Sequence, residues 1–250
     1  MMETGGKERY HLLDGLRGLT LISMICYHGM FDLVELYGVP VWWFWKLPGY
    51  VWQQSICWTF ILLSGFCWKL GRNPLKRGMI ISTCGILITL VTYCFLPEER
   101  ILCGILTFTG AAVLSLIPLS GLLEKIPAQA GLFGSAFLFF LTRNINSGCL
   151  GFESLFLGSV PKVFYQGIFM TALGFPEPGF FSGDYFSYFP WIFLYLCGYF
   201  LYELLMKREP VQKFLQSRTY VLDWIGRKSL ILYMLHQPVL LLVLECVFVD

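Results

Sequence analysis

The sequence predicts an all-α integral membrane protein, a polytopic bundle of about seven transmembrane helices, with six to eight as the range. Of the 250 residues, 56% are hydrophobic and only 14% are charged, whereas soluble domains carry about a quarter charged residues. Several apolar stretches approach the roughly 20 residues that a bilayer-spanning helix needs. Aromatic residues reach 18% of the chain, with eight Trp, which is typical of helices that end among lipid headgroups.

Seven apolar stretches are the candidate spans, and we interpret the whole chain, residues 1–250, as one membrane domain. The candidates are residues 13–36, 51–69, 79–96, 101–119, 128–142, 188–206 and 229–248. The fifth is short. Residues 162–175 are apolar over only about 14 positions, which favours a re-entrant or interfacial segment over a span, although the sequence leaves both open. Residues 37–50, rich in Trp and Pro, are expected to lie along the membrane interface.

The distribution of positive charge predicts that the N-terminus lies in the cytoplasm. With seven spans in this orientation, all but four of the 18 Lys and Arg fall in cytoplasmic segments or helix ends, Lys7 among them, as the positive-inside rule requires. The four on the outer side are Lys46, Arg100, Arg143 and Lys162. The C-terminal Asp250 is then outside, and residues 143–187 form the longest outer connection.

Net charge and cysteine usage exclude several classes of protein. A net charge of +2 gives no electrostatic basis for nucleic-acid binding. The nine Cys include no CxxC pair and no ligand-type spacing with His, so we predict neither a disulfide framework nor a metal site. The sequence leaves the oligomeric state open, a homo-oligomer included.

The first span carries five ionisable residues on one narrow stripe. These are Asp14, Arg17, His28, Asp32 and Glu35, and at about 100° per residue they fall within an arc of about 60°. Ionisable groups within spans usually face the protein interior or a water-filled cavity, so we expect the stripe to face other helices or a cavity. Arg17 and His28 are about 16 Å apart along the axis. Asp32 is one turn beyond His28, positioned to orient its ring and raise its basicity.

Structural interpretations of the same residues stay open. Asp14 and Arg17 also fit an ion pair at the membrane interface. His28 also fits a hydrogen bond between two helices, and Glu35 fits a solvated position at the outer helix end.

Two other segments hold candidate site residues. The first cytoplasmic loop contains Lys69, Arg72, Lys76 and Arg77, which either set the topology or attract the phosphates of an acyl-CoA. The last helix is expected to open with Asp223, Arg227, Lys228 and Ser229 and to carry His236 before Pro238. Ser229 and His236 share a helix face, and Pro238 could free a backbone carbonyl near His236. A purely structural His236 is the alternative.

Five segments together resemble a known family. The opening RYHLLDGLRGLTLISMICYHGMFDL resembles bacterial relatives of lysosomal heparan-α-glucosaminide N-acetyltransferase, which belong to a transmembrane acyltransferase superfamily that includes the acyltransferase-3 proteins. Its D-x-x-R-G element is Asp14, Arg17 and Gly18, and Arg17 with His28 is similar to the R-x10-H spacing of acyltransferase-3 members. The other four segments are WTFILLSGFCWKLGR (58–72), ILCGILTFTGAAVLSLI (101–117), GDYFSYFPWIFLYLCGYFLYELL (183–205) and IGRKSLILYMLHQPVLL (225–241).

The resemblance implies an acyl-CoA-dependent O- or N-acyltransferase of a bacterial plasma membrane, without a metal. Acetyl-CoA or another acyl-CoA would supply the acyl group on the cytoplasmic side, and an amino sugar or glycan hydroxyl would accept it outside, entering from residues 143–187. His28 would be the base or acyl carrier, supported by Asp32, with Arg17 and Asp14 as the charged part of the catalytic site. The implied cofactor contacts are Arg17, Arg72, Lys76, Arg77, Arg227 and Lys228. The implied substrate pocket contains Ser229, His236 and Trp191, and Ser229, Tyr165 and Trp191 are the oxyanion candidates.

Two departures from the family pattern limit what the resemblance implies. The lysosomal enzyme has a histidine implicated in catalysis in its first luminal loop, whereas residues 37–50 contain no His. Thr107 stands where many bacterial relatives carry His. The heparan substrate is therefore not carried over, and acyl chain length and acceptor identity stay open. A solute or proton-coupled transporter is the alternative function, because a polar stripe also suits solute passage, and a membrane scaffold or sensor is a third.

Overall fold

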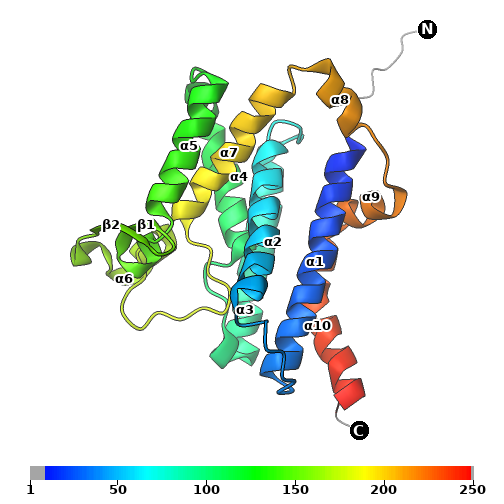
Figure 1. The fold of residues 1–250 in the computed structure, drawn as a ribbon, viewed down its shortest axis with the longest axis vertical. Helices are drawn as coiled ribbons and strands as arrows, with labels where there is room; N and C mark the ends of the chain where they lie inside the picture. Colours follow the sequence, from blue (N-terminus) through cyan, green and yellow to red (C-terminus); the bar gives the residue numbers. More distant parts are fainter. Residues whose placement is uncertain (1–8, 249–250) are drawn as a thin grey trace. The chain divides into compact units, whose positions relative to one another are not determined.

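The computed structural model describes residues 9–248 and is mostly helical (Figure 1). The helices are α1 (His11–Glu35), α2 (Leu47–Phe66), α3 (Pro74–Phe95), α4 (Ile105–Leu123), α5 (Ala128–Thr142), α6 (Gly167–Leu173), α7 (Tyr188–Leu205), α8 (Glu209–Leu215), α9 (Tyr220–Arg227) and α10 (Ser229–Phe248). Three short 3-10 helices cover Pro97–Glu99, Ile145–Ser147 and Lys162–Phe164. Lys7 and Asp250, used in the predicted topology, lie outside the described residues.

Each of the seven predicted spans contains a helix. Four helices, namely α3, α4, α7 and α10, are long and apolar enough to cross a bilayer, and the chain is a membrane protein. Helix α1 has 25 residues and α2 has 20, whereas α5 has only 15. A count of seven spans therefore stays a prediction, as does the orientation of the termini.

The expectation of an all-α fold is wrong in one region. Strands β1 (Cys149–Phe152) and β2 (Leu155–Ser159) form an antiparallel hairpin. Their connection, Glu153 and Ser154, is a two-residue turn with Glu153 at a φ of 50°, and such tight hairpin turns need positive φ. Within residues 162–175 the only α-helix is α6, with seven residues, so no helix spans a membrane there.

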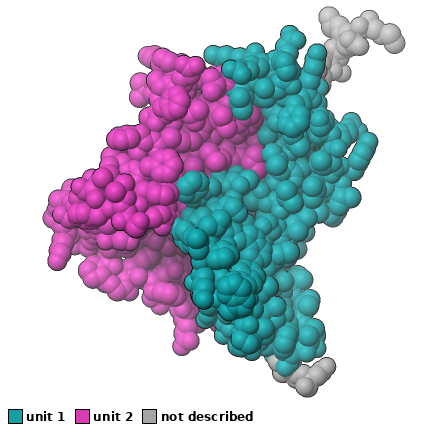
Figure 2. Space-filling model, in the orientation of Figure 1, with its two compact units in different colours: residues 1–60, 205–250 teal, residues 61–204 magenta. Residues whose placement is uncertain are grey.

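The chain divides into two compact units (Figure 2). Unit 1 comprises residues 1–60 and 205–250, and unit 2 comprises residues 61–204, so the boundary falls within α2. This division does not test the prediction that residues 1–250 form one membrane domain. In unit 1, α1, the first part of α2, α9 and α10 meet around a small apolar core of Leu21, Met24 and Ile56, against which Trp52, Ile225 and Leu232 pack.

In unit 1, glycines allow α9 to lie directly against α1. A Cβ atom on Gly18 would lie 2.2 Å from the backbone oxygen of Leu222, and one on Gly226 would lie 1.8 Å from that of Asp14. A Cβ on Gly15 would lie 2.2 Å from Thr219 Oγ1. The glycine of the D-x-x-R-G element is thus a packing residue, and α9 is held beside the ionisable part of α1.

In unit 2, glycines also allow close contact between helices at two places. Gly65 and Gly198 bring the end of α2 against α7, because a Cβ on either would lie within about 2 Å of a backbone oxygen of the other helix. Gly85 and Gly110 likewise bring α3 close to α4, because a Cβ on Gly85 would lie 2.7 Å from the backbone nitrogen of Thr107 and one on Gly110 would lie 2.2 Å from Ser82 Oγ. The start of α3 is also capped, because the side chain of Asn73 accepts a hydrogen bond from the backbone N–H of Lys76.

Candidate functional site

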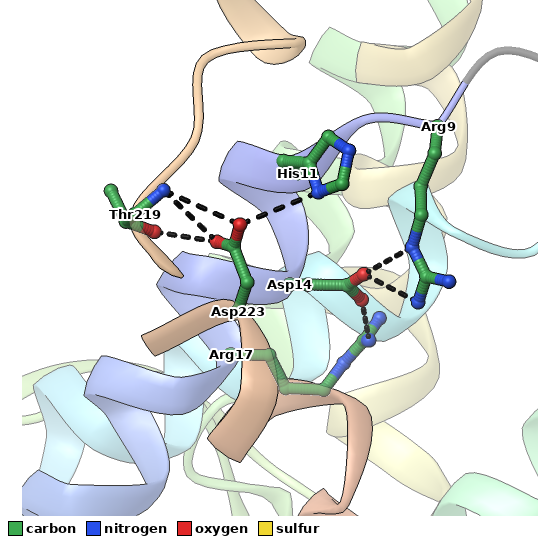
Figure 3. A network of polar contacts seen from close by, with 6 residues as sticks. All are labelled: Arg9, His11, Asp14, Arg17, Thr219 and Asp223. Carbon is green, nitrogen blue, oxygen red and sulfur yellow. Dashed lines mark hydrogen bonds and ion pairs between the residues drawn. The ribbon is translucent and has the colours of Figure 1, made fainter. Parts of the chain in front are cut away.

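The N-terminal end of α1 carries an ionic network (Figure 3). The Asp14 carboxylate accepts hydrogen bonds from Arg9 Nε and Nη2, at 3.0 and 2.8 Å, and from Arg17 Nη1, at 3.1 Å. Asp14 and Arg17 are three positions apart on the helix, which places their side chains on the same face. The predicted pairing of Asp14 with Arg17 is therefore present, with Arg9 as an additional partner.

A second carboxylate lies nearby and joins α9 to α1. Asp223 is buried and accepts a hydrogen bond of 2.6 Å from Thr219 Oγ1, and His11 Nδ1 lies 3.3 Å from its other oxygen (Figure 3). Burial alone would raise the pKa of Asp223, but the hydrogen bonds from Thr219 and the nearby His11 and Arg227 hold it below its usual value. The expectation that Asp223 and Arg227 open the last helix is wrong, because they belong to the separate helix α9.

The central feature of the site is a pair of histidines. The ring centroids of His28, on α1, and His236, on α10, are 4.9 Å apart. His236 Nδ1 lies within hydrogen-bond distance of the backbone oxygen of Tyr233. A carbonyl oxygen can only accept, so this contact places the proton of neutral His236 on Nδ1 and leaves the lone pair of Nε2 available.

A buried carboxylate–amide pair accompanies the two histidines. Asp32 is 2% exposed, and Gln237 Nε2 donates to both of its carboxylate oxygens, each at 2.9 Å. Gln237 follows His236 directly, so the same turn of α10 supplies a ring to His28 and an amide to Asp32. As expected, the stripe of ionisable residues on α1 faces another helix at His28 and Asp32. Glu35, at the end of the stripe, is exposed.

Two polar atoms at this position have no partner among the described residues. They are His236 Nε2 and Gln237 Oε1, and both are buried. A buried acceptor without a hydrogen bond is costly and is often explained by a ligand or a catalytic role. His236 Nε2 can therefore accept a proton, and the imidazole of His28 lies beside it.

Two of the positively charged side chains in and beside the α2–α3 loop are bonded to other groups of the protein. Arg77 donates from Nη1 to the oxygen of Cys67 and from Nη2 to that of Trp68, which satisfies carbonyls after the end of α2. Lys69 contacts Glu203 and lies 3.1 Å from Glu124 Oε1. Burial would lower the pKa of Lys69, but these two carboxylates raise it above its usual value. Arg72 and Lys76, the other two predicted phosphate contacts of this loop, are exposed.

The remaining predicted site residues lie in different parts of the chain. Arg227 and Lys228 are exposed at the end of α9, and Ser229 begins α10. Trp191 belongs to unit 2, where it is buried, packs on Phe139 and stacks with the Arg143 guanidinium at 5.0 Å. Tyr165, also in unit 2, donates a hydrogen bond of 2.6 Å to the backbone oxygen of Ile145. Trp191 and Tyr165 thus belong to unit 2, whereas both histidines of the pair belong to unit 1.

Sequence reasoning missed Gln237, which lies beside the histidine pair, and His11, which contacts Asp223 at the N-terminal end of α1. Gln237 stands beside His236 in the H-Q-P segment, and its position directly after a candidate histidine was the available signal. His11 was missed because a histidine at the very start of a helix has no pattern that identifies its partner, which here comes from α9.

Comparison with known proteins identifies one family. The family model described as heparan-alpha-glucosaminide N-acetyltransferase, catalytic, matches residues 9–238. This range covers α1 with its ionic network, both histidines of the pair and Gln237. Searches of curated proteins and of solved structures gave no significant match.

Proposed function

The chain belongs to the heparan-alpha-glucosaminide N-acetyltransferase catalytic family, and from this membership, which indicates a membrane acetyltransferase in general terms, we propose that it transfers an acetyl group from acetyl-CoA to a sugar amine or hydroxyl across the membrane. The observation that supports this proposal most strongly is the contact between His28 and His236, with centroids 4.9 Å apart. Two imidazoles at this spacing provide both a proton acceptor and a second nitrogen that can hold or relay a proton.

The chemistry requires one bond to form and one to break. The acceptor nitrogen or oxygen attacks the thioester carbonyl carbon, the C–S bond breaks, and CoA leaves as a thiolate that takes up a proton. His28 removes the proton of the acceptor, or its nitrogen first takes the acyl group and then passes it on. In either route, the free lone pair on His236 Nε2 accepts a proton from His28 or from the acceptor.

The Asp32–Gln237 pair supports the position of the histidines. Asp32 lies one turn beyond His28 on α1, and Gln237 lies next to His236 on α10. The two hydrogen bonds between them therefore join the two helices at the level of the rings. Fixed geometry of this kind lowers the entropic cost of reaching the reactive arrangement.

Positive side chains of unit 1 are the proposed contacts for the CoA phosphates. Arg227 and Lys228 are exposed. Arg17 lies near them because Gly18 and Gly226 bring α1 and α9 into close contact. Arg17 is held by Asp14 at 3.1 Å, which orients the guanidinium. Under the proposed orientation, with the N-terminus in the cytoplasm of a bacterial cell and the C-terminus outside, these residues face the cytoplasmic CoA pool.

A reconstitution experiment tests the proposal against the transporter alternative. Purified protein in liposomes receives acetyl-CoA with a labelled acetyl group on one side, and glucosamine is trapped on the other. An acetyltransferase produces labelled N-acetylglucosamine and an equal amount of free CoA, and empty liposomes produce neither. If label crosses as intact acetyl-CoA or acetate without acetylated product, the protein is a transporter and the proposal is wrong.

A further inference from the structure

The segment after α5 carries an unusual amount of exposed apolar surface. Between Glu153 and Glu177 the only charged residue is Lys162. Six side chains in this stretch are more than half exposed, and we call them the apolar face: Leu155, Phe156, Leu157, Val163, Ile168 and Phe169. A surface loop in water normally presents polar side chains, and a contiguous exposed apolar patch marks an interaction site.

Several hydrogen bonds tie this segment to the residues around it. The side-chain amide of Asn144 pairs with both backbone groups of Glu153, at 2.8 and 3.1 Å. Asn146 Nδ2 donates to the backbone oxygen of Gly174 and to Ser187 Oγ, both at 2.9 Å. Thr171 is fully buried. These bonds hold the segment in a fixed structure. Its exposed surface carries the six apolar side chains together with Ser154, Ser159, Lys162 and Gln166.

The length of α5 places this segment near lipid. Helices α4 and α5 are joined by residues 124–127 only, so α4 ends and α5 begins on the same side of unit 2. Helix α5 has 15 residues, or about 22 Å at 1.5 Å per residue, which is short of the roughly 30 Å of the hydrocarbon core. Figure 1 shows β1, β2 and α6 gathered at the far end of α5, and Phe152 of β1 packs on Phe140 of α5 at 4.8 Å.

We propose that the apolar face lies in the membrane leaflet at the far end of α5, with its side chains among the lipid acyl chains. The unpaired edges of a two-stranded sheet cannot lie in hydrocarbon, where backbone groups find no hydrogen-bond partner. The backbone of the hairpin therefore sits at headgroup level, where water and polar headgroups can bond the unpaired edges. Placing these six side chains in lipid removes their apolar surface from water, which is favourable by about 25 cal/mol per Å² of that surface. The inference does not depend on acyl transfer.

Photocrosslinking tests which partner covers the face. p-Benzoylphenylalanine replaces Phe156, a conservative change of one aromatic side chain, in the full chain in nanodiscs of phosphatidylethanolamine and phosphatidylglycerol. After irradiation, intact mass spectrometry measures protein that carries the mass of one phospholipid. The same substitution at Phe169 provides a second position on the face, and that at Glu177, exposed at the charged end of the same connection, is the matched control.

We expect phospholipid adducts at Phe156 and Phe169 at about ten or more times the yield at Glu177, because only the first two positions contact lipid in the proposed arrangement. Equal yields at all three positions, or no lipid adduct at Phe156 and Phe169 in protein that elutes as a single species, would overturn the proposal. A crosslinked dimer in place of the lipid adduct would also overturn it and would assign the face to a second copy of the chain.

Discussion

The rings of His28 and His236, from the first and last helices of the chain, lie with their centroids 4.9 Å apart. No short-range pattern joins these residues, since the whole of unit 2 lies between them in the sequence. The contact depends on the packing of α10 against α1. The same packing lets Gln237 reach Asp32, so one helix pair supports both contacts.

The hydrogen bonds from Gln237 to Asp32 are expected to stabilise unit 1. Substitution Gln237→Leu removes two bonds to a buried carboxylate, so we expect a loss of about 1–3 kcal/mol in the free energy of unfolding. A double-mutant cycle with Asp32→Asn, followed by thermal unfolding in detergent, should give a coupling of roughly 0.5–3 kcal/mol. Additive effects of the two substitutions would show that the contact contributes nothing.

The close approach of α9 to α1 predicts that Gly18 tolerates no side chain. In Gly18→Ala the new Cβ would lie 2.2 Å from the backbone oxygen of Leu222, so the helices must separate, at a cost of about 1–3 kcal/mol. Gly29→Ala is the control on the same helix, because its Cβ would make only an ordinary contact of 3.4 Å with Leu240. There we expect no loss, or a gain of about 0.5–1 kcal/mol from helix propensity. Equal melting temperatures for the two variants would contradict the packing described.

Asp184 predicts a pH dependence of stability. It accepts a hydrogen bond from the backbone N–H of Ile105 at 3.2 Å, and burial raises its pKa from 3.8 to about 6, with that bond acting in the opposite direction. The folded chain therefore holds this proton more tightly than the unfolded chain does. The stabilisation is fully present below pH 3.8 and is lost as the pH rises to about 6.

The variant Asp184→Asn isolates this effect, because the amide oxygen still accepts from Ile105 but does not titrate. We expect the melting temperature of the wild-type chain to fall relative to that of the variant between pH 4 and 7. The difference should be constant at higher pH. A difference that does not change with pH would show that Asp184 keeps an ordinary pKa.

The long apolar helices could be predicted from the sequence, and their partners could not. Hydropathy determines where a helix lies in lipid, and α10 begins and ends at the predicted residues 229 and 248. The spacing on α1 also indicated the face that carries Asp32. Which residue would meet that face depended on α10, far away in the sequence, so Gln237 was missed.

The hairpin and α9 were missed for local reasons. Strands β1 and β2 have four and five residues, too few to show an alternating pattern, and their apolar side chains resemble an interfacial segment. Asp223 and Arg227 look like the polar start of a span, but the chain breaks after α9 at Lys228. The fit of α9 depends on Gly15 and Gly18, whose role becomes visible only when both helices are in place.

The most direct test of the account uses the three histidines of the chain, His11, His28 and His236. Purified wild-type protein and the three His→Ala variants receive acetyl-CoA and glucosamine, and free CoA is followed over time, with melting temperatures as the check on folding. We expect His28→Ala and His236→Ala to lose about 10²–10⁴-fold in rate, the usual contribution of a general acid or base, while His11→Ala keeps a rate close to that of the wild type. Full activity in folded His28→Ala would contradict acyl transfer at the histidine pair.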